Sequence, residues 1–285
     1  MDQNMMLLAD SGSTKTDWCL VEGGTEVLRV ETGGTNPFFQ SPERIGQEID
    51  SALMPRVGTY AVRSVFFYGA GCAFPEQIET VRGVLAVRFP EARIEVGSDM
   101  TAAARALCGR RPGIACILGT GSNSCLWNGG AIAANVSPLG FILGDEGSGA
   151  VLGRRLVGDC LKNRLPRGLR EKFLARFDLT PAAILERVYR QPFPNRFLAS
   201  LSPFLAEHID VPEIRTIVFE GFTDFFRRNA MQYDGWDRLD VHCTGSVAYY
   251  YREVLREAAA ECGLRLGTVM RSPMAGLVAY HSSEE

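Results

Sequence analysis

The sequence has little of what a zinc-binding or disulfide-stabilised protein needs. It contains only three histidines, none in an H-x-x-x-H pair, and its eight cysteines are scattered singly with no C-x-x-C pair. Zinc sites and disulfide frameworks require such clusters. Scattered cysteines, several of them within apolar stretches, are typical of buried free thiols. We therefore expect no zinc site, and we expect the protein to work in a reducing cytoplasm.

Long apolar runs and an excess of one charge are also absent. No run of about 18 apolar residues occurs, and the first residues lack the basic segment of a secretory signal. The formal net charge is −3 over 285 residues, of which 46% are hydrophobic and 22% charged. Such a composition is typical of a soluble globular chain with room for two domains. It gives no general attraction to nucleic acid or to a membrane surface, so we expect neither as a partner.

Three turns rich in Gly, Ser and Thr follow apolar runs, and they are the most informative feature present. They are Asp10–Thr16 (DSGSTKT), Gly119–Ser122 (GTGS) and Thr244–Val247 (TGSV). Glycine lets the main chain approach an anion, and small hydroxyl residues leave donors pointing outward. Each turn is a plausible phosphate cradle, and their repetition indicates a nucleotide held between two halves.

The order of predicted elements is duplicated along the chain. Three short strands (5–10, 17–22 and 26–30), with Gly23 and Gly24 as a hairpin turn, precede alternating helices and strands up to residue 108. After a turn-rich break at 109–113 the same order restarts, with a helical insertion ending near residue 204. We therefore predict an α/β protein with an N-terminal domain at 1–111 and a C-terminal domain with extra helices at 112–285.

Two familiar nucleotide motifs and one hydrolase motif do not fit. A Walker A loop needs glycine directly before the lysine, but Thr14 precedes Lys15. The second turn lacks the third glycine of a dinucleotide fingerprint, and no G-x-S-x-G elbow occurs. Lys15 is then either a hairpin residue facing phosphate or a solvated charge, and the sequence leaves both open.

The duplicated order and the three turns resemble the actin, Hsp70 and sugar kinase superfamily. Within it, Gly33–Asn36 (GGTN), Ser98–Ala103 (SDMTAA) and Gly144–Gly149 (GDEGSG) are similar to the N-acetylglucosamine kinase branch, the BadF/BadG/BcrA/BcrD ATPases. The match spans nearly the whole chain. It implies two ribonuclease H-like (actin-like ATPase) domains with a nucleotide cleft between them, and ATP and Mg²⁺ as cofactors.

The resemblance also implies roles for single residues in phosphoryl transfer, which is mostly positioning and charge neutralisation. Asp10 is similar to the family's metal-binding aspartate, and Asp99 to the general base that accepts the proton of the sugar hydroxyl. The implied nucleotide contacts come from all three turns: Ser11, Gly12, Ser13, Thr14, Lys15, Gly119, Thr120, Gly121, Gly245, Ser246 and Val247. The implied sugar contacts are Thr35, Asn36, Ser122, Asn123, Gly144, Asp145 and Glu146.

Three of these acidic residues have an alternative interpretation. Asp10 could simply cap its own turn. Asp99 stands where a helix N-cap belongs, just after the predicted strand 93–96. Ser148 could cap a helix, and Asp145 and Glu146 would then lie near the positive N-terminal end of that helix. A favourable charge interaction with this helix end would then be the sole role of Glu146.

The function implied is ATP-dependent phosphorylation of a hydroxyl, the 6-hydroxyl, of N-acetylglucosamine or a related amino sugar, with a homodimer as a family-level expectation. Pro138–Leu143 departs from the histidine and tryptophan that animal N-acetylglucosamine kinases have before the Gly-Asp-Glu motif. This more apolar wall leaves room for N-acetylmuramic acid or glucosamine. Two alternatives stay open: an ATPase activator of a 2-hydroxyacyl-CoA dehydratase, which needs cluster-binding cysteines, and a sugar sensor without turnover.

Overall fold

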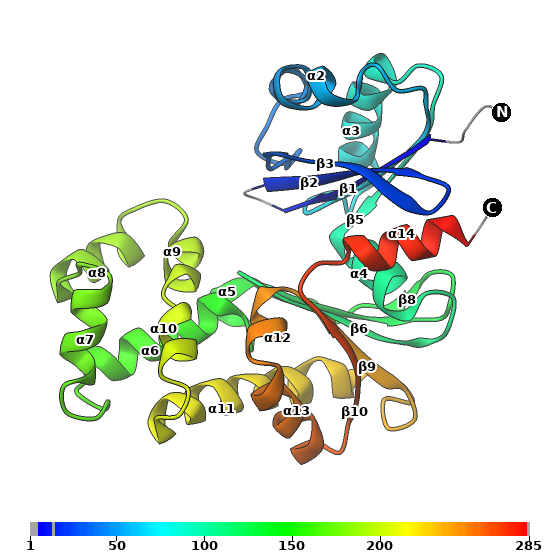
Figure 1. Cartoon of the computed structure of the whole chain (residues 1–285). Helices are drawn as coiled ribbons and strands as arrows, with labels where there is room; N and C mark the ends of the chain where they lie inside the picture. Colours follow the sequence, from blue (N-terminus) through cyan, green and yellow to red (C-terminus); the bar gives the residue numbers. More distant parts are fainter. Residues whose placement is uncertain (1–4, 13–14, 284–285) are drawn as a thin grey trace. The chain divides into compact units, whose positions relative to one another are not determined.

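The computed structural model describes residues 5–12 and 15–283, so the predicted phosphate contacts Ser13 and Thr14 lie outside the described residues. The chain divides into two compact units, each described here by itself. The first unit contains the described residues up to 109 and from 273 onward, and the second contains 110–272. Each unit contains one five-stranded sheet (Figure 1).

The sheet of the first unit has the strand order β3-β2-β1-β4-β5. Its strands are β1 (Met5–Ser11), β2 (Lys15–Glu22), β3 (Thr25–Gly33), β4 (Val62–Gly69) and β5 (Arg93–Ser98). The first three strands are antiparallel, whereas β4 and β5 run parallel to β1. Gly23 and Gly24 have φ of 54° and 79°, as the predicted hairpin requires.

Alternating apolar residues give this sheet two buried faces. Leu7, Ala9 and Trp18 pack with α1 (Pro42–Glu48), the π-helical turn η1 (Ile49–Leu53), α2 (Met54–Val57) and α3 (Pro75–Arg88). Met6 and Leu8 point the other way, toward α4 (Asp99–Cys108) and α14 (Met274–Ser282). Figure 1 shows α2 and α3 on one side of β1–β3, and α4 and α14 on the other. The period of two in β1 produces this division.

The last helix corrects the predicted domain limits. We expected 112–285 to form one domain, but α14 belongs to the first compact unit. Its Met274 and Leu277 are buried against Met6 and Leu8 of β1. The face of β1 that α1–α3 leave uncovered needs an apolar partner, and α14 supplies it together with α4.

The second unit repeats the strand arrangement of the first. Its order is β10-β9-β6-β7-β8, made of β6 (Gly113–Leu118), β7 (Ser122–Trp127), β8 (Ile132–Ala134), β9 (Asp240–Thr244) and β10 (Arg265–Met270). The strands β6, β7 and β8 are antiparallel, and β9 and β10 run parallel to β6. The predicted duplication, and with it the α/β fold class, is confirmed.

Helices account for the greater length of this unit, as predicted. They are α5 (Gly140–Leu143), α6 (Gly149–Leu161), α7 (Leu169–Arg176), α8 (Pro181–Tyr189), α9 (Pro194–Ser200), α10 (Pro203–Glu207), α11 (Pro212–Arg228), the 3₁₀ turn η2 (Ala230–Gln232), α12 (Ser246–Tyr250) and α13 (Arg252–Glu261). Tyr251, where φ is −105°, separates α12 from α13. Ile114, Cys116 and Leu118 of β6 belong to the core that these helices cover.

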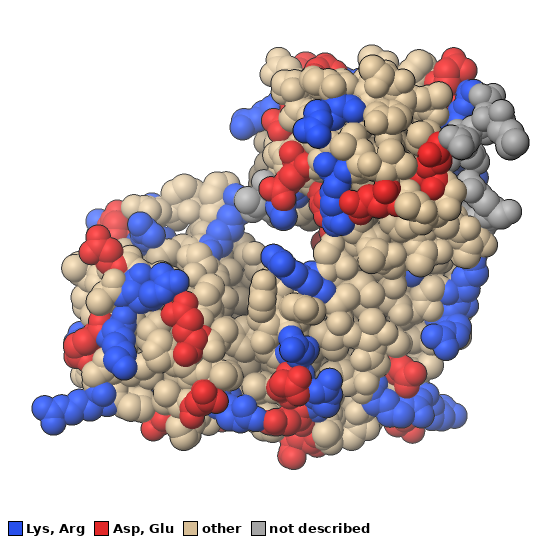
Figure 2. Space-filling model, viewed as in Figure 1, with Lys and Arg blue, Asp and Glu red and all other residues tan. Residues whose placement is uncertain are grey.

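The described residues also show the character of the helices, the distribution of charge and the state of the cysteines. None of their helices has both the length and the apolar character needed to cross a bilayer. On the face shown in Figure 2, cationic and anionic side chains are intermixed. All eight cysteines are buried, as the sequence predicted.

Candidate functional site

Asp10 and Asp99 lie at the same edge of the first sheet. Asp10 is paired with Tyr68 of β4, which is paired with Gly97 of β5, and Asp99 follows the end of β5 directly. Because β1, β4 and β5 are parallel, their carboxyl ends meet at one edge, where α/β proteins place ligands. The two carboxylates expected to serve catalysis and metal binding are therefore brought together.

Asp99 is the first residue of α4 and is not its N-cap. Ser98 occupies the cap, and its Oγ accepts a hydrogen bond from the Thr101 N–H at 3.1 Å. The alternative interpretation of Asp99 is therefore wrong. Its carboxylate accepts from the Met100 N–H at 2.8 Å. Burial raises the pKa of Asp99, and the hydrogen bond from Met100 opposes that shift.

Asp10 is a half-buried carboxylate with charges of both signs near it. Burial raises its pKa to about 7, and the charges of Asp99 and Asp17 act in the same direction, whereas Arg29 and Lys15 oppose the shift. Asp17 lies directly opposite Asp10 in the β1–β2 register. Among the described residues, the Asp10 side chain makes no hydrogen bond. An unpaired carboxylate beside two others fits a divalent cation by its chemistry.

The same carboxylates would not enclose a metal ion by themselves. Within 5–12 and 15–283, no group of three His, Cys, Asp or Glu side chains is arranged to hold one. Mg²⁺ commonly uses one or two carboxylates, keeps several waters and shares its remaining positions with phosphates. The residues present therefore fit Mg²⁺ bound together with a nucleotide.

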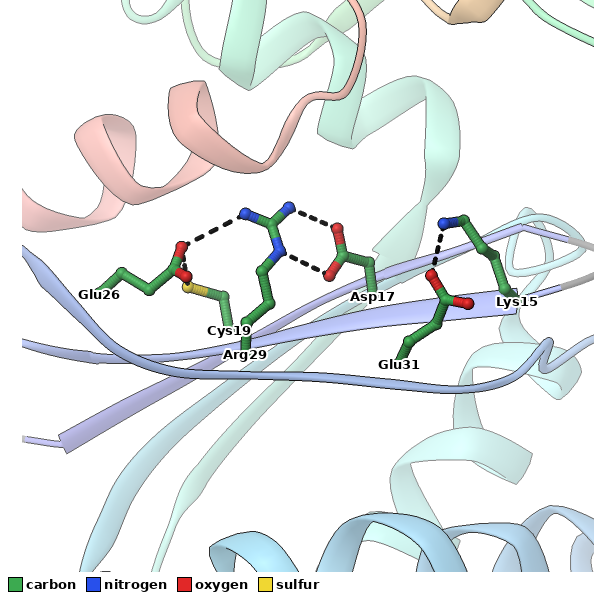
Figure 3. Close-up of polar contacts among 6 residues, drawn as sticks. All are labelled: Lys15, Asp17, Cys19, Glu26, Arg29 and Glu31. Atoms are coloured by element: carbon green, nitrogen blue, oxygen red, sulfur yellow. Dashed lines mark hydrogen bonds and ion pairs between the residues drawn. The ribbon is translucent and has the colours of Figure 1, made fainter.

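Charged side chains form a row of ion pairs along β2 and β3 that begins at this edge (Figure 3). The Arg29 guanidinium binds both carboxylate oxygens of Asp17, at 2.8 and 2.5 Å, and reaches Glu26 at 3.3 Å. Sequence analysis did not single out Asp17 or Arg29. The signal was available, because opposite residues in antiparallel strands share a face, and Asp17 faces Asp10.

Lys15 is paired within the protein. Its Nζ lies 2.5 Å from Glu31 Oε2, and both side chains are about 60% exposed (62% and 61%). An exposed pair of this kind is worth at most about 1 kcal/mol, so a phosphate group could displace Glu31. The pair leaves both interpretations of Lys15 open.

The predicted sugar loop is fastened to the end of β1 by Ser11. The Ser11 hydroxyl accepts from the Thr35 N–H at 3.1 Å and lies 2.7 Å from the Thr16 hydroxyl. Ser11 is completely buried. Its side chain therefore holds the loop, and the predicted contact of Ser11 with the nucleotide stays a prediction. Thr35 is itself buried, whereas Asn36 is half-buried.

Asn36 has one hydrogen-bonding group to spare. Its Oδ1 accepts from the Phe38 N–H at 3.0 Å, an Asx turn. Its main-chain N–H donates to Gln40 Oε1 at 2.7 Å. Among the described residues, the Asn36 Nδ2 amide has no partner. That amide is a suitable donor to a sugar hydroxyl.

In the second unit, the turn after β6 and the loop before α6 are joined by main-chain hydrogen bonds. Gly149 N–H donates to Gly119 O at 2.8 Å, and Ala150 N–H donates to Thr120 O at 3.1 Å. Asp145, at φ 54°, accepts from the Ser122 N–H at 3.2 Å. Glycine at position 121 leaves room for the Asp145 carboxylate, because a Cβ on residue 121 would lie 3.2 Å from Asp145 Oδ2. The structure thus brings Gly119, Thr120, Gly121, Ser122 and Asp145 together.

These residues differ in how accessible they are. Thr120 is exposed, Ser122 is buried and Asp145 is half-buried. Burial raises the pKa of Asp145, the Ser122 N–H lowers it, and Glu146 raises it further. Asn123 Oδ1 accepts from Asn135 Nδ2 at 3.0 Å.

Glu146 is engaged inside the protein. Its carboxylate accepts from Asn229 Nδ2 at 3.3 Å and lies 3.6 Å from the Arg228 guanidinium. Ser148 caps α6, as the alternative interpretation expected, since its Oγ accepts from the Val151 N–H at 3.2 Å. Glu146 therefore ties the loop to the end of α11.

The third turn packs tightly against the end of β6. Gly245 has φ 117°, and a Cβ there would lie 2.2 Å from Leu118 O. Ser246 is exposed and Val247 is buried. Beyond them, Tyr249 and Tyr250 contact edge to face at 5.6 Å, and Arg271 lies over the Tyr250 ring at 5.6 Å. Sequence analysis missed this aromatic cluster.

Three solved structures are similar to this chain over nearly its whole length. A Porphyromonas gingivalis protein provisionally assigned as an N-acetylglucosamine kinase shares 52% identity at TM-score 0.95, covering 98% of this chain and 99% of its own. A Chromobacterium violaceum protein with the same provisional assignment shares 21% identity at TM-score 0.75, covering 98% and 99%. MreB 5 of Spiroplasma citri, solved with AMPPNP, shares 10% at TM-score 0.54, covering 99% and 95%.

The chain matches no family model and no curated protein. The structural likenesses confirm the actin-like ATPase fold that the sequence predicted.

Proposed function

We propose that this chain, which belongs to the N-acetylglucosamine kinase-like family, phosphorylates a hydroxyl of N-acetylglucosamine or a closely related amino sugar. It is a sugar kinase, a phosphotransferase that uses ATP. The amino sugar, the 6-hydroxyl as acceptor and Mg²⁺ as metal are the finer parts of the proposal.

The observation that carries the proposal is the position of Asp99 beside Asp10 and the Asn36 loop. Asp99 is not the N-cap of α4, and it follows the end of β5. In the proposed reaction it accepts the proton of the attacking sugar hydroxyl. The hydroxyl oxygen forms the new bond to the γ-phosphorus, the bond to the β–γ bridging oxygen breaks, and ADP leaves.

Each remaining group has a part in positioning. Mg²⁺, held by Asp10, would neutralise charge on the phosphates. The Asn36 amide donates to the sugar, and Ser122, Asn123 and Asp145 are proposed further sugar contacts. The turns at 119–121 and 245–247 contact the nucleotide, and Tyr250 with Arg271 offers its base a surface for stacking.

The test is ADP release from Mg·ATP with N-acetylglucosamine, N-acetylmuramic acid, glucosamine and glucose, with the product analysed by phosphorus NMR. We expect release that depends on an amino sugar and a phosphate ester at the 6-position. Nucleotide hydrolysis without any sugar dependence would contradict a kinase and favour the activator. Binding of sugar and nucleotide without turnover would favour the sensor.

A further inference from the structure

Three phenylalanines are exposed beside the Asn36 loop. Phe38 is 50% exposed, Phe74 59% and Phe39 80%. Phe38 and Phe74 contact each other edge to face, with ring centroids 6.2 Å apart and planes at 88°. For Phe39 no ring contact is recorded among the described residues. Two large apolar rings are thus ordered against each other while still open to solvent.

Gly71 fixes where the Phe38 ring lies. This glycine has φ 90°, and a Cβ there would lie 2.6 Å from Asn36 Oδ1 and 3.0 Å from Phe38 Cδ2. Asn36 and Phe38 therefore pack together on the main chain of the loop that follows β4. The same loop carries Phe74, which comes directly before α3. The polar and aromatic groups thus form one surface.

This surface lies next to the carboxylate edge of the sheet. Cys72 is in the same loop, and burial raises its pKa to about 12, with the charge of Asp99 as the second cause. The main-chain N–H of Thr35, the residue before Asn36, donates a hydrogen bond to Ser11, the residue after Asp10. Phe38 and Phe74 are therefore separated by only a few residues of chain from groups that lie near Asp10 and Asp99.

A sugar has polar edges and apolar C–H faces, and an aromatic ring covers such a face well. The Asn36 Nδ2 amide, which has no partner within 5–12 and 15–283, supplies a donor. The rings supply the apolar surface that ligand sites combine with a few polar groups. We propose that Phe38 and Phe74 bind the apolar surface of the amino sugar, its C–H face or its acyl methyl group, and thereby determine which sugar is accepted. This inference rests on the proposed function and adds two residues to its sugar site.

The test compares Phe38→Ala and Phe74→Ala with the matched control Phe39→Ala in the full chain. Sugar affinity is measured by calorimetric titration without nucleotide, alongside KM and kcat for sugar and KM for ATP. Losing one ring contact should weaken sugar binding about 5- to 20-fold in the first two variants, with the KM for ATP unchanged. Phe38→Tyr should restore the affinity, and Phe39→Ala should match wild type.

The sugar panel distinguishes the two kinds of contact. Equal weakening for N-acetylglucosamine, glucosamine and glucose identifies the C–H face, and weakening confined to N-acetylated sugars identifies the methyl group. Unchanged sugar affinity in Phe38→Ala and Phe74→Ala, or the same loss in Phe39→Ala, overturns the inference. If wild type binds sugar without turnover, the kinase proposal fails while the titration still decides this one. If it binds no sugar, both fail.

Discussion

The Ser11 side chain and the main chain of Thr35 are joined by hydrogen bonds in both directions. The hydroxyl accepts from the Thr35 N–H at 3.1 Å and faces the Thr35 carbonyl oxygen at 3.2 Å as donor. A buried side chain therefore ties the Asn36 loop to the residue that follows Asp10.

Replacing Ser11 with alanine should loosen the sugar loop. The variant leaves the buried Thr35 N–H without a partner, which costs about 1–3 kcal/mol of unfolding free energy. The KM for sugar should rise more than the KM for ATP. Calorimetry and steady-state kinetics measure both. Ser51→Ala, at an exposed site in the same unit, is the control and should stay within about 0.5 kcal/mol of wild type. If the KM for ATP rises more than the KM for sugar, the result favours a contact between Ser11 and the nucleotide.

Asp99→Asn should abolish most turnover while leaving the fold intact. Loss of a general base lowers kcat by about 10²- to 10⁴-fold, and the KM values should change little. The control is Ser98→Ala, which removes the actual helix cap and costs about 1 kcal/mol of stability. That variant should keep most of its kcat. If Ser98→Ala loses activity as severely as Asp99→Asn, the two residues act only through the start of α4.

The raised pKa of Asp10 makes a prediction about pH. Its pKa is about 7 in the folded protein against 3.8 in the unfolded chain, so the folded state binds more protons between these values. Stability contributed at this site therefore falls as pH rises from about 4 to 7. Asp10→Asn removes that loss, and its stability advantage over wild type should grow by roughly 2–3 kcal/mol between pH 5 and pH 8.

Denaturant titrations at both pH values measure the Asp10 effect. Asp50→Asn, at a carboxyl group on the surface, is the control and should show no comparable growth. Mg·ADP should stabilise wild type more than Asp10→Asn, because the metal compensates the carboxylate charge. An advantage that does not change with pH would contradict a strongly raised pKa.

Leu277→Ala should weaken the first unit, although the residue comes from the far end of the chain. Leu277 is fully buried against β1, and such a truncation costs about 2–5 kcal/mol. Hydrogen exchange should speed up in β1 and β4 and leave β6 and β9 protected. Leu255→Ala, equally buried in the second unit, should give the opposite pattern. Faster exchange in β6 and β9 of the Leu277 variant would place α14 with the second unit.

Much of the site could be predicted because its signals are local. The apolar run Met6–Ala9 predicts a strand that ends at Asp10, and in the structure its alternate residues enter two different clusters. The glycines of the turns mark where the main chain needs a positive φ or close approach, as Gly245 does. Such features depend on a few neighbouring residues, so the sequence alone determined the order of elements along the chain, its duplication and the place of Asp10 and Asp99 after predicted strands.

Other features depend on residues far apart in the chain, and only the tertiary structure decided them. The contact of the Ser11 hydroxyl with the Thr35 N–H joins residues 24 positions apart, and no local pattern predicts it. Leu277 joins the first unit because β1 has an uncovered apolar face, a demand that its own sequence segment does not contain. Phe38 and Phe74 meet because Gly71 lets two loops pack together. The periodicity of a strand or helix predicts which of its faces a side chain lies on. Which other residues that face contacts depends on the packing of segments that are far apart in the sequence.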